Sequence, residues 1–190
     1  MSPKTKFDKK SIVDAALEIA KEKGLKEITA RSVAKKLKSS VAPIYVNFDS
    51  VDELVESVVQ RFFSLSEEYL EKQEGKSMFE KIGRASLTLA KEYPIIYREL
   101  AIEPNQYMSS YESIEENMLK EMSKDEDMKE LTLIEQKKLL FKMRAFQTGF
   151  LAMIVNKNIP SWLKDEDIDE MLIEVGEELL FVKKMGDKTK

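Results

Sequence analysis

Apolar residues recur at helical spacing along most of this chain, and residues that break helices seldom interrupt them. Only 6 glycines and 5 prolines occur among 190 residues, and Leu, Glu, Lys, Ala and Met, which favour helices, are abundant. Hairpins and long loops are therefore disfavoured. The sequence predicts an all-α fold.

Capping signals divide the N-terminal part into short helices. Asp8 can cap a first helix, which ends near Gly24, where a left-handed C-cap is needed. Thr29 can cap a second helix over 30–37, and Ser40 can cap a third. These signals predict a compact three-helix head.

A longer fourth helix follows the head. Ile44, Tyr45 and Phe48 are expected to anchor the third helix, and Ser50 with Glu53 forms a capping box for the next, which we expect to reach residue 72. Prolines separate further helical segments. These are predicted over 77–93, 95–101, 109–124, 133–156 and 165–185.

The chain contains neither cysteine nor histidine. Disulfides, zinc sites of the Cys/His kind and Ser-His-Asp triads are therefore excluded, and no phosphate-binding loop is present. We expect no catalytic residues, no metal site, no cofactor and no enzyme activity. The lack of cysteine suits the cytoplasm, and no run of about 18 apolar residues predicts a membrane span.

Charge is unevenly distributed. Residues 1–48 hold 11 Lys/Arg and 5 Asp/Glu, whereas the rest hold 20 and 30. A basic head on an acidic body favours contact with a polyanion, although a cluster of solvated lysines would look the same.

Two short helices joined by about three residues form a helix-turn-helix, in which the second helix enters the DNA major groove. The segment IVDAALEIAKEKGLKEITARSVAKKLKSSVAPIYVNFDSVDELVESVV resembles the DNA-binding segment of the tetracycline-repressor (TetR) family. The positions that match the family pattern are Gly24, Thr29, Ala34, Ile44, Tyr45, Phe48, Ser50, Glu53 and Leu54.

The resemblance implies DNA-contacting roles. Residues 39–43 would face the groove, where small side chains favour hydroxyl contacts and thymine-methyl packing, and Tyr45 would direct its hydroxyl to a phosphate. Lys6, Lys9, Lys10 and Lys35 would be further candidate phosphate partners. The expected DNA-binding residues are Thr29, Arg31, Lys36, Lys38, Ser39, Ser40, Val41, Ala42, Pro43 and Tyr45.

The segment also departs from the family pattern. Lys38 and Ser39 occupy the turn, where the family usually has Gly and an apolar residue, and Val41 and Val51 replace lysines that are common in the family. The alternative function is therefore a helical dimer that binds a small molecule or a protein and has lost specific DNA recognition.

The helix over 133–156 is apolar on nearly all sides. Leu139, Met143 and Phe150 lie on one face, and Phe141 and Leu151 lie on others. A helix of this kind must be buried on both sides, and the last helix repeats the pattern. We expect a homodimer through the last two helices, as the resemblance also implies. A well-wrapped monomer is the alternative.

Soft and polar residues in the body predict a pocket for a small-molecule effector of unknown identity. The candidate lining residues are Met78, Tyr97, Tyr107, Met118, Met122, Arg144, Gln147 and Thr148. Together these features predict a DNA-binding domain over 1–49 and a helical ligand-binding and dimerisation domain over 50–190. The predicted function is a ligand-responsive repressor that binds double-stranded DNA at a palindromic operator as a dimer.

Overall fold

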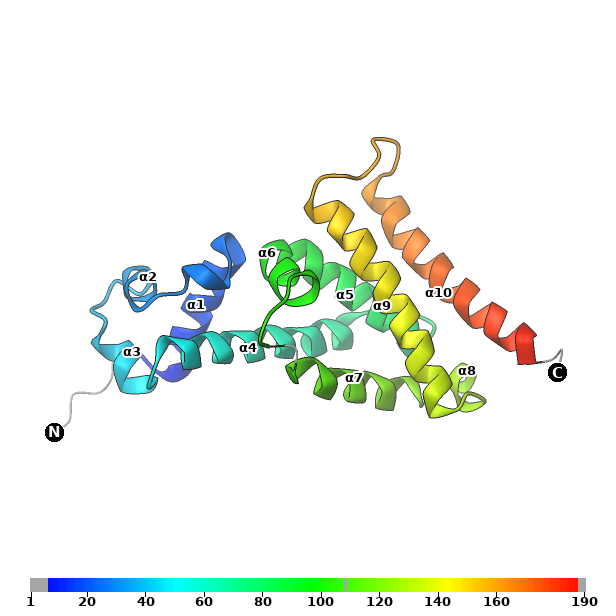
Figure 1. Ribbon diagram of the computed structural model, residues 1–190, viewed down its shortest axis with the longest axis horizontal. Helices are drawn as coiled ribbons and strands as arrows, with labels where there is room; N and C mark the ends of the chain where they lie inside the picture. The colour runs from blue at the N-terminus through cyan, green and yellow to red at the C-terminus, as the bar shows by residue number, and fades with distance from the viewer. Residues whose placement is uncertain (1–6, 108, 188–190) are drawn as a thin grey trace. The chain divides into compact units, whose positions relative to one another are not determined.

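A computed structural model describes residues 7–107 and 109–187 of the chain, and these residues form helices and no strands (Figure 1). The all-α prediction is confirmed. The helices are α1 (Lys9–Lys23), η1 (Leu25–Glu27), α2 (Ala30–Lys36), α3 (Ala42–Asn47), α4 (Val51–Lys72), α5 (Met78–Glu92), α6 (Pro94–Tyr97), the π-helix η2 (Arg98–Ile102), α7 (Ser109–Met122), α8 (Glu126–Lys129), α9 (Leu133–Val155) and α10 (Asp165–Asp187).

The described residues pack as two units. Unit 1 consists of Met1–Leu65 and Glu92–Ser110, and unit 2 consists of Ser66–Lys91 and Tyr111–Lys190. Helix α4 contributes its first part to unit 1 and its last turns to unit 2. Among the described residues, no helix has both the length and the hydropathy needed to cross a bilayer.

Local signals set the ends of α1. The Asp8 carboxylate accepts a hydrogen bond from the Ser11 N–H at 2.8 Å, which satisfies a free donor of the first turn. At the other end Gly24 has a φ of 98°, and its N–H donates to the Ala20 carbonyl. A residue with a side chain would be strained in this conformation. Both predicted caps of α1 are confirmed.

The segment α6–η2 belongs to unit 1 although it is distant from α1 in sequence. The Glu99 carboxylate accepts a hydrogen bond from the Leu25 N–H at 2.7 Å. Ile96 and Leu100 are buried, and the ammonium of Lys21 lies 4.4 Å from the Tyr93 ring centre. The end of α1 is therefore held by residues that follow α5, and we call the Glu99–Leu25 contact the latch.

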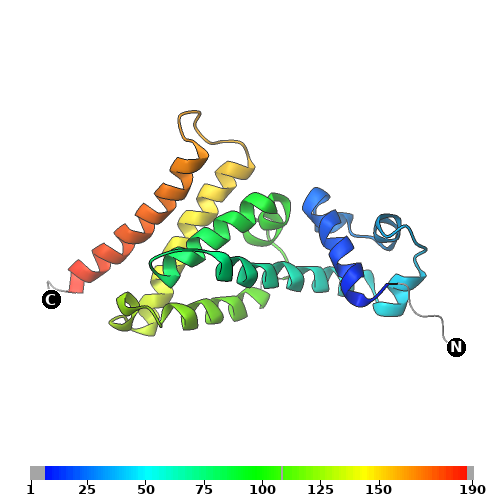
Figure 2. The ribbon, with the colours of Figure 1, turned by 180° about the vertical axis from the view of Figure 1, so that it is seen from behind.

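Unit 2 has a core between α5, α9 and α10. Helices α9 and α10 lie side by side (Figures 1 and 2), and both contribute buried side chains, which include Leu139, Met143 and Leu172. A methyl group on Gly83 of α5 would lie 3.3 Å from Leu172 and from the Gln147 amide nitrogen. The absence of a side chain at this position therefore lets α5 approach the other two helices closely.

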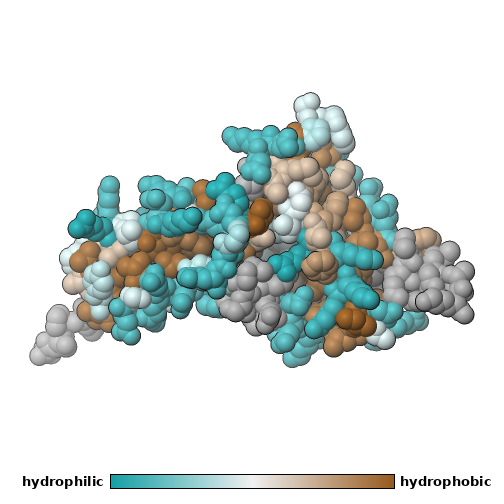
Figure 3. All heavy atoms as spheres, in the orientation of Figure 1, coloured by the Kyte–Doolittle hydropathy of each residue, from teal (hydrophilic) through white to brown (hydrophobic). Residues whose placement is uncertain are grey.

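Among the described residues, nothing covers one side of α9. Ile134 and Phe141 are 58% and 64% exposed, and Ala145 and Gly149 continue the same face at helical spacing. Figure 3 shows apolar residues gathered over α9. The sequence predicts burial on both sides of α9, and within a single chain one side is buried and the other is exposed.

Two local predictions are wrong. Ser40 does not cap α3: the Val41 carbonyl accepts from the Ile44 N–H at 3.1 Å, so Val41 occupies the N-cap position. Tyr45 is not a core anchor, because 58% of it is exposed. The three-residue 3₁₀ helix η1 and the four-residue helix α8 lie between predicted segments and were not expected. The other helices match the predictions to within a few residues, with the segment 95–101 divided between α6 and η2.

Candidate DNA-binding surface

The helix-turn-helix is positioned by a small apolar core in unit 1. Val33 and Ala34 of α2 are buried, as are Ile44 of α3 and Phe48, which follows it. The Phe48 ring also lies under the Lys9 ammonium, 4.7 Å from the ring centre. This packing fixes α3 by one side and leaves its other side to solvent.

Thr29 sets the start of α2. Its hydroxyl accepts from the Ser32 N–H at 3.0 Å, and the Ser32 hydroxyl accepts from the Thr29 N–H at 2.9 Å. This reciprocal capping box confirms the predicted cap. Arg31, in the first turn, is exposed and forms no ion pair with any described residue. Its guanidinium is therefore available to an anion.

The turn between α2 and α3 contains a strained residue. Lys38 has a φ of 51°, a left-handed conformation in which a side chain is crowded by its own backbone. The resemblance places Gly at this point, and the observed backbone gives the physical reason. Lys38 is exposed, and Ser39 is half-buried with its hydroxyl donating to the Ser40 carbonyl at 3.0 Å.

The outer side of α3 carries small and apolar side chains. Ser40 and Ala42 are exposed, Val41 is 38% exposed, and Pro43 is half-buried. Val46 is 69% exposed and shares a face with Ala42, four residues earlier. Val46 is not among the sequence-predicted site residues, although this spacing on a short helix would have identified it.

Several of the expected phosphate partners are engaged elsewhere. The Lys36 ammonium lies 3.3 Å from the Glu22 carboxylate. The Lys9 ammonium lies 2.8 Å from the Glu53 carboxylate and thereby joins the start of α1 to the start of α4. Lys10 and Lys35 are exposed, and Lys6 lies outside the described residues.

The Glu53 carboxylate holds several groups together. The hydrogen bond from Lys9, and then the one from the Asp49 N–H at 2.7 Å, lower the pKa of Glu53 below its usual range. Ser50 caps the same turn by accepting from the Glu53 N–H at 3.1 Å. The charge of Glu53 therefore orders the junction between α3 and α4.

A sequence model of bacterial regulatory proteins of the tetR family matches residues 12–58. The matched residues include α2, the strained turn and α3 with its exposed side. Residues 12–58 therefore form a helix-turn-helix head of the TetR family, a family of DNA-binding regulators of transcription. TetR regulators bind DNA and associate as dimers. A comparison with curated proteins gives no match.

The sequence-predicted pocket residues are divided between the two packing units. Tyr97 and Tyr107 belong to unit 1. In unit 2, Met122 and Gln147 are buried, and Arg144 and Thr148 are half-buried. The Gln147 amide nitrogen is buried and has no hydrogen-bond partner in the part of the chain that the structure describes.

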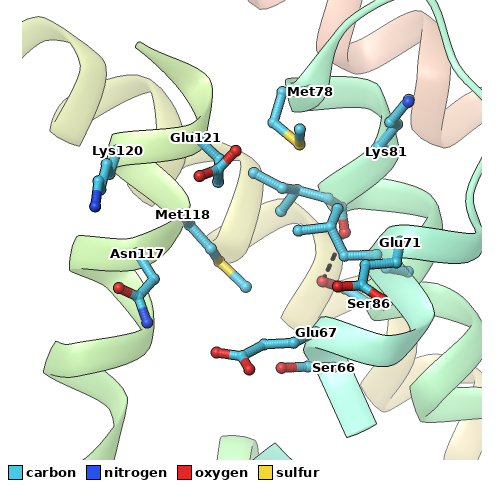
Figure 4. Close-up of a pocket in the computed structure, with 13 residues that line it drawn as sticks. Ser66, Glu67, Glu71, Met78, Lys81, Ser86, Asn117, Met118, Lys120 and Glu121 are labelled. Atoms are coloured by element: carbon cyan, nitrogen blue, oxygen red, sulfur yellow. Dashed lines mark hydrogen bonds between the residues drawn. The ribbon is translucent and has the colours of Figure 1, made fainter. Parts of the chain in front are cut away.

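Met78 and Met118, by contrast, line one cavity of about 450 Å³ in unit 2, which we call the α4–α5–α7 cavity (Figure 4). Among the described residues, no group of acidic side chains is placed to hold a metal ion. The residues lining the cavity are Ser66, Glu67, Leu70, Glu71, Met78, Lys81, Ile82, Ala85, Ser86, Asn117, Met118, Lys120 and Glu121.

Proposed function

We propose that this TetR-family regulator is a ligand-responsive repressor that binds a palindromic operator as a homodimer. The observation that carries the proposal is the division of α3 into two sides. Ile44 is buried, whereas Tyr45 and Val46, next to it, are more than half exposed. A helix of six residues with exposed apolar side chains on one side suits contact with base edges and thymine methyl groups.

The proposed DNA contacts combine two kinds of group. Val41, Ala42 and Val46 would touch base edges, with the hydroxyl groups of Ser39 and Ser40 beside them. Arg31, Lys38 and Tyr45 would contact phosphates, which position the protein without reading sequence. Thr29, Lys36 and Pro43 complete the proposed surface, and Lys36 would exchange Glu22 for a phosphate.

The proposed dimer interface is the uncovered side of α9 together with α10. Phe141 supplies a large apolar anchor, and Ala145 and Gly149 supply a flat surface on which a second helix can approach closely. A methyl group on Gly149 would meet no atom within 4 Å in the single chain. A second copy of the chain is the occupant we propose, since it would bury this side and place two α3 helices about 34–36 Å apart.

The proposed ligand response acts through α4. This helix contributes Glu53 to the junction with α3 in unit 1 and Glu67 and Glu71 to the α4–α5–α7 cavity in unit 2. A ligand shifts a conformational equilibrium only if it binds the two states differently, so it must touch an element that moves. We propose α4 as that element.

The proposed domains divide the chain by role: residues 1–49 bind DNA, and residues 50–190 bind ligand and form the dimer. The packing units differ from this division because the first part of α4 and the segment α6–η2 pack with the head.

The experiment is a titration of the full chain against its own promoter region, followed by fluorescence anisotropy at several salt concentrations. We expect binding that weakens steeply with salt, since released counterions contribute to affinity. Replacing Arg31 and Tyr45 together by alanine should weaken binding at least about tenfold. The control pair Lys124→Ala and Lys129→Ala, two exposed lysines of unit 2 outside α9 and α10, should have a much smaller effect.

A regulator that has lost DNA recognition would behave differently. It would bind promoter and unrelated DNA only weakly, and the Arg31 and Tyr45 variants would match the unmodified chain. Val41 and Val51, which stand where the family often has lysines, are the residues that favour this second function. Weak binding to both DNAs would therefore reject the repressor in favour of a dimer without specific DNA recognition.

A further inference from the structure

The α4–α5–α7 cavity has the size and the walls of a binding site for a small organic molecule. Its volume of about 450 Å³ lies within the range of cavities that hold ligands of this kind. Leu70 of α4, Met78 and Ile82 of α5 and Met118 of α7 provide an apolar lining. The two flexible thioether side chains, which Figure 4 shows on opposite sides of the cavity, can adapt to ligands of different outline.

Carboxylates dominate the charge that the cavity presents. Glu67 and Glu71 have no ion-pair partner among the described residues, and Figure 4 shows Glu67 extending from α4 towards α7. A third carboxylate, that of Glu121, is paired with Lys124 at 2.6 Å. The apolar walls therefore lie beside two negative charges that the protein leaves uncompensated.

The lysines that line the cavity do not neutralise these two charges. The ammonium groups of Lys81 and Lys120 point away from the space between the two methionines (Figure 4). Lys72, the next cation along α4, is directed to the Tyr69 ring, 5.8 Å from its centre. These three lysines thus line the cavity or lie next to it in the sequence, but their ammonium groups are turned elsewhere.

Glu67 and Glu71 line the cavity with exposed side chains. They are four residues apart near the C-terminal end of α4, where a neighbouring like charge and the helix dipole each weakly disfavour a negative charge. A positive group bound beside them would relieve both costs. An anion would add to them.

We propose that the α4–α5–α7 cavity binds an organic cation with an apolar body, with the cationic centre beside Glu67 and Glu71 and the body between Met78 and Met118. This inference rests on the proposed ligand response and names the chemical class of its effector. It concerns binding to the free protein, so it can be tested without DNA.

The test compares two ions of matched size and shape but opposite charge, tetraphenylphosphonium and tetraphenylborate. Each is titrated into the full chain without DNA by isothermal titration calorimetry. We expect the phosphonium to bind at least about tenfold more tightly than the borate. Equal binding, tighter binding of the borate, or no binding of either ion would overturn the proposal.

Variants assign the charge preference to residues. The double variant Glu67→Gln and Glu71→Gln should bind the phosphonium about tenfold more weakly and the borate no more weakly than before. Glu74→Gln, an exposed acidic residue that does not line the cavity, is the matched control. If the double variant and the control bind the phosphonium alike, the assignment to Glu67 and Glu71 is wrong.

Two measurements keep this test separate from the proposed function. Thermal unfolding without ligand checks that the double variant is folded, and removal of two repelling charges should leave its stability equal or higher. Promoter binding is measured separately. Loss of DNA binding with retained phosphonium binding would reject the repressor alone, whereas DNA binding without a cation preference would reject the cation site alone.

Discussion

Lys38 lowers the stability of the fold and, in the proposed complex, contributes to DNA binding. Its left-handed backbone costs about 1–2 kcal/mol for a residue with a side chain, and a glycine there would avoid this cost. Its exposed ammonium is one of the proposed phosphate contacts. Replacing Lys38 by glycine should therefore raise the stability of the fold and lower the affinity for DNA.

We expect Lys38→Gly to raise the free energy of unfolding by about 0.5–1 kcal/mol, because the relief of strain exceeds the entropy that glycine adds to the unfolded chain. Denaturant unfolding measures this change. Lys35→Gly is the control: Lys35 lies inside α2, where glycine should destabilise by about 1 kcal/mol. A loss of stability in Lys38→Gly would contradict the interpretation.

Glu53 links protonation to the stability of the head. Its pKa is lowered by the hydrogen bond from Lys9 and then by that from the Asp49 N–H, so its charge stabilises the folded state above its ordinary pKa of 4.5. This contribution is lost as the pH falls from there through the lower pKa of the folded state. The unmodified chain should therefore lose stability in that acidic range.

Glu53→Gln tests this linkage. The variant should be less stable than the unmodified chain at neutral pH, and the difference should shrink as the pH falls below 4.5. Denaturation midpoints between neutral and strongly acidic pH measure it. Glu56→Gln, an exposed neighbour on α4, is the control. A constant difference at all pH values would show that Glu53 acts through packing and not through its charge.

At the scale of the elements, the latch ties η2 to the end of α1. Glu99 satisfies the half-buried Leu25 N–H, and Asn105 in turn donates to the Glu99 and Leu100 carbonyls at 3.1 and 3.0 Å. Gly24 leaves room for this arrangement, because a methyl group there would lie 2.6 Å from a Glu99 carboxylate oxygen. The missing side chain at Gly24, the Glu99–Leu25 hydrogen bond and the hydrogen bonds from Asn105 thus depend on one another.

We expect Glu99→Ala to lower the free energy of unfolding by about 1–3 kcal/mol, because the Leu25 N–H would be left without an acceptor. Glu99→Gln should cost less, since its amide oxygen can still accept. Glu103→Ala, which breaks the exposed ion pair with Arg98, should cost less than about 1 kcal/mol. Denaturant unfolding ranks the three variants, and equal costs for Glu99→Ala and Glu103→Ala would contradict the latch.

Local signals explain why so many elements could be predicted. Caps such as Asp8 and Thr29 act on residues within one turn, so their patterns are visible in the sequence. The latch joins residues that are 74 positions apart, and no periodicity indicates such a pair. Helix α8 was missed because four residues are too few for a helical pattern.

The surfaces were harder to predict than the helices. Met78 and Met118 follow from their soft, apolar character, and the structure brings both to the α4–α5–α7 cavity. Glu67 and Glu71 were not predicted as pocket residues, because two exposed glutamates one turn apart have the pattern of any solvated helix side, and only the fold shows that they line the cavity. Tyr45 was expected to be an anchor because aromatic residues usually are, and only packing reveals that Ile44 and Phe48 fill that core without it.

At the scale of the whole molecule, we expect Phe141→Glu to convert the proposed dimer into a folded monomer, because it places a charge on the apolar side of α9. Analytical ultracentrifugation measures the mass, and circular dichroism checks the helices. Ile102→Glu, at an exposed apolar residue of unit 1, should leave the mass unchanged. A dimer that survives Phe141→Glu would place the interface elsewhere.

Gly149→Ala separates a close helix contact from a solvent-exposed position. In a single chain, alanine should stabilise α9 by about 1 kcal/mol, since the added methyl group meets nothing. In the proposed dimer, the same group would push the second helix away and weaken association. Sedimentation over a range of protein concentrations, combined with unfolding measurements, distinguishes the two outcomes.

The packing of α6–η2 with α1 limits how the protein can be taken apart. A fragment cut after Leu65 would lose Ile96, Leu100 and Glu99, and the surface of α1 that they cover would face water. Grafting only the first fifty residues onto a different regulator would leave that surface against foreign side chains. A chimaera that keeps its specificity should therefore transplant 92–107 together with the N-terminal helices.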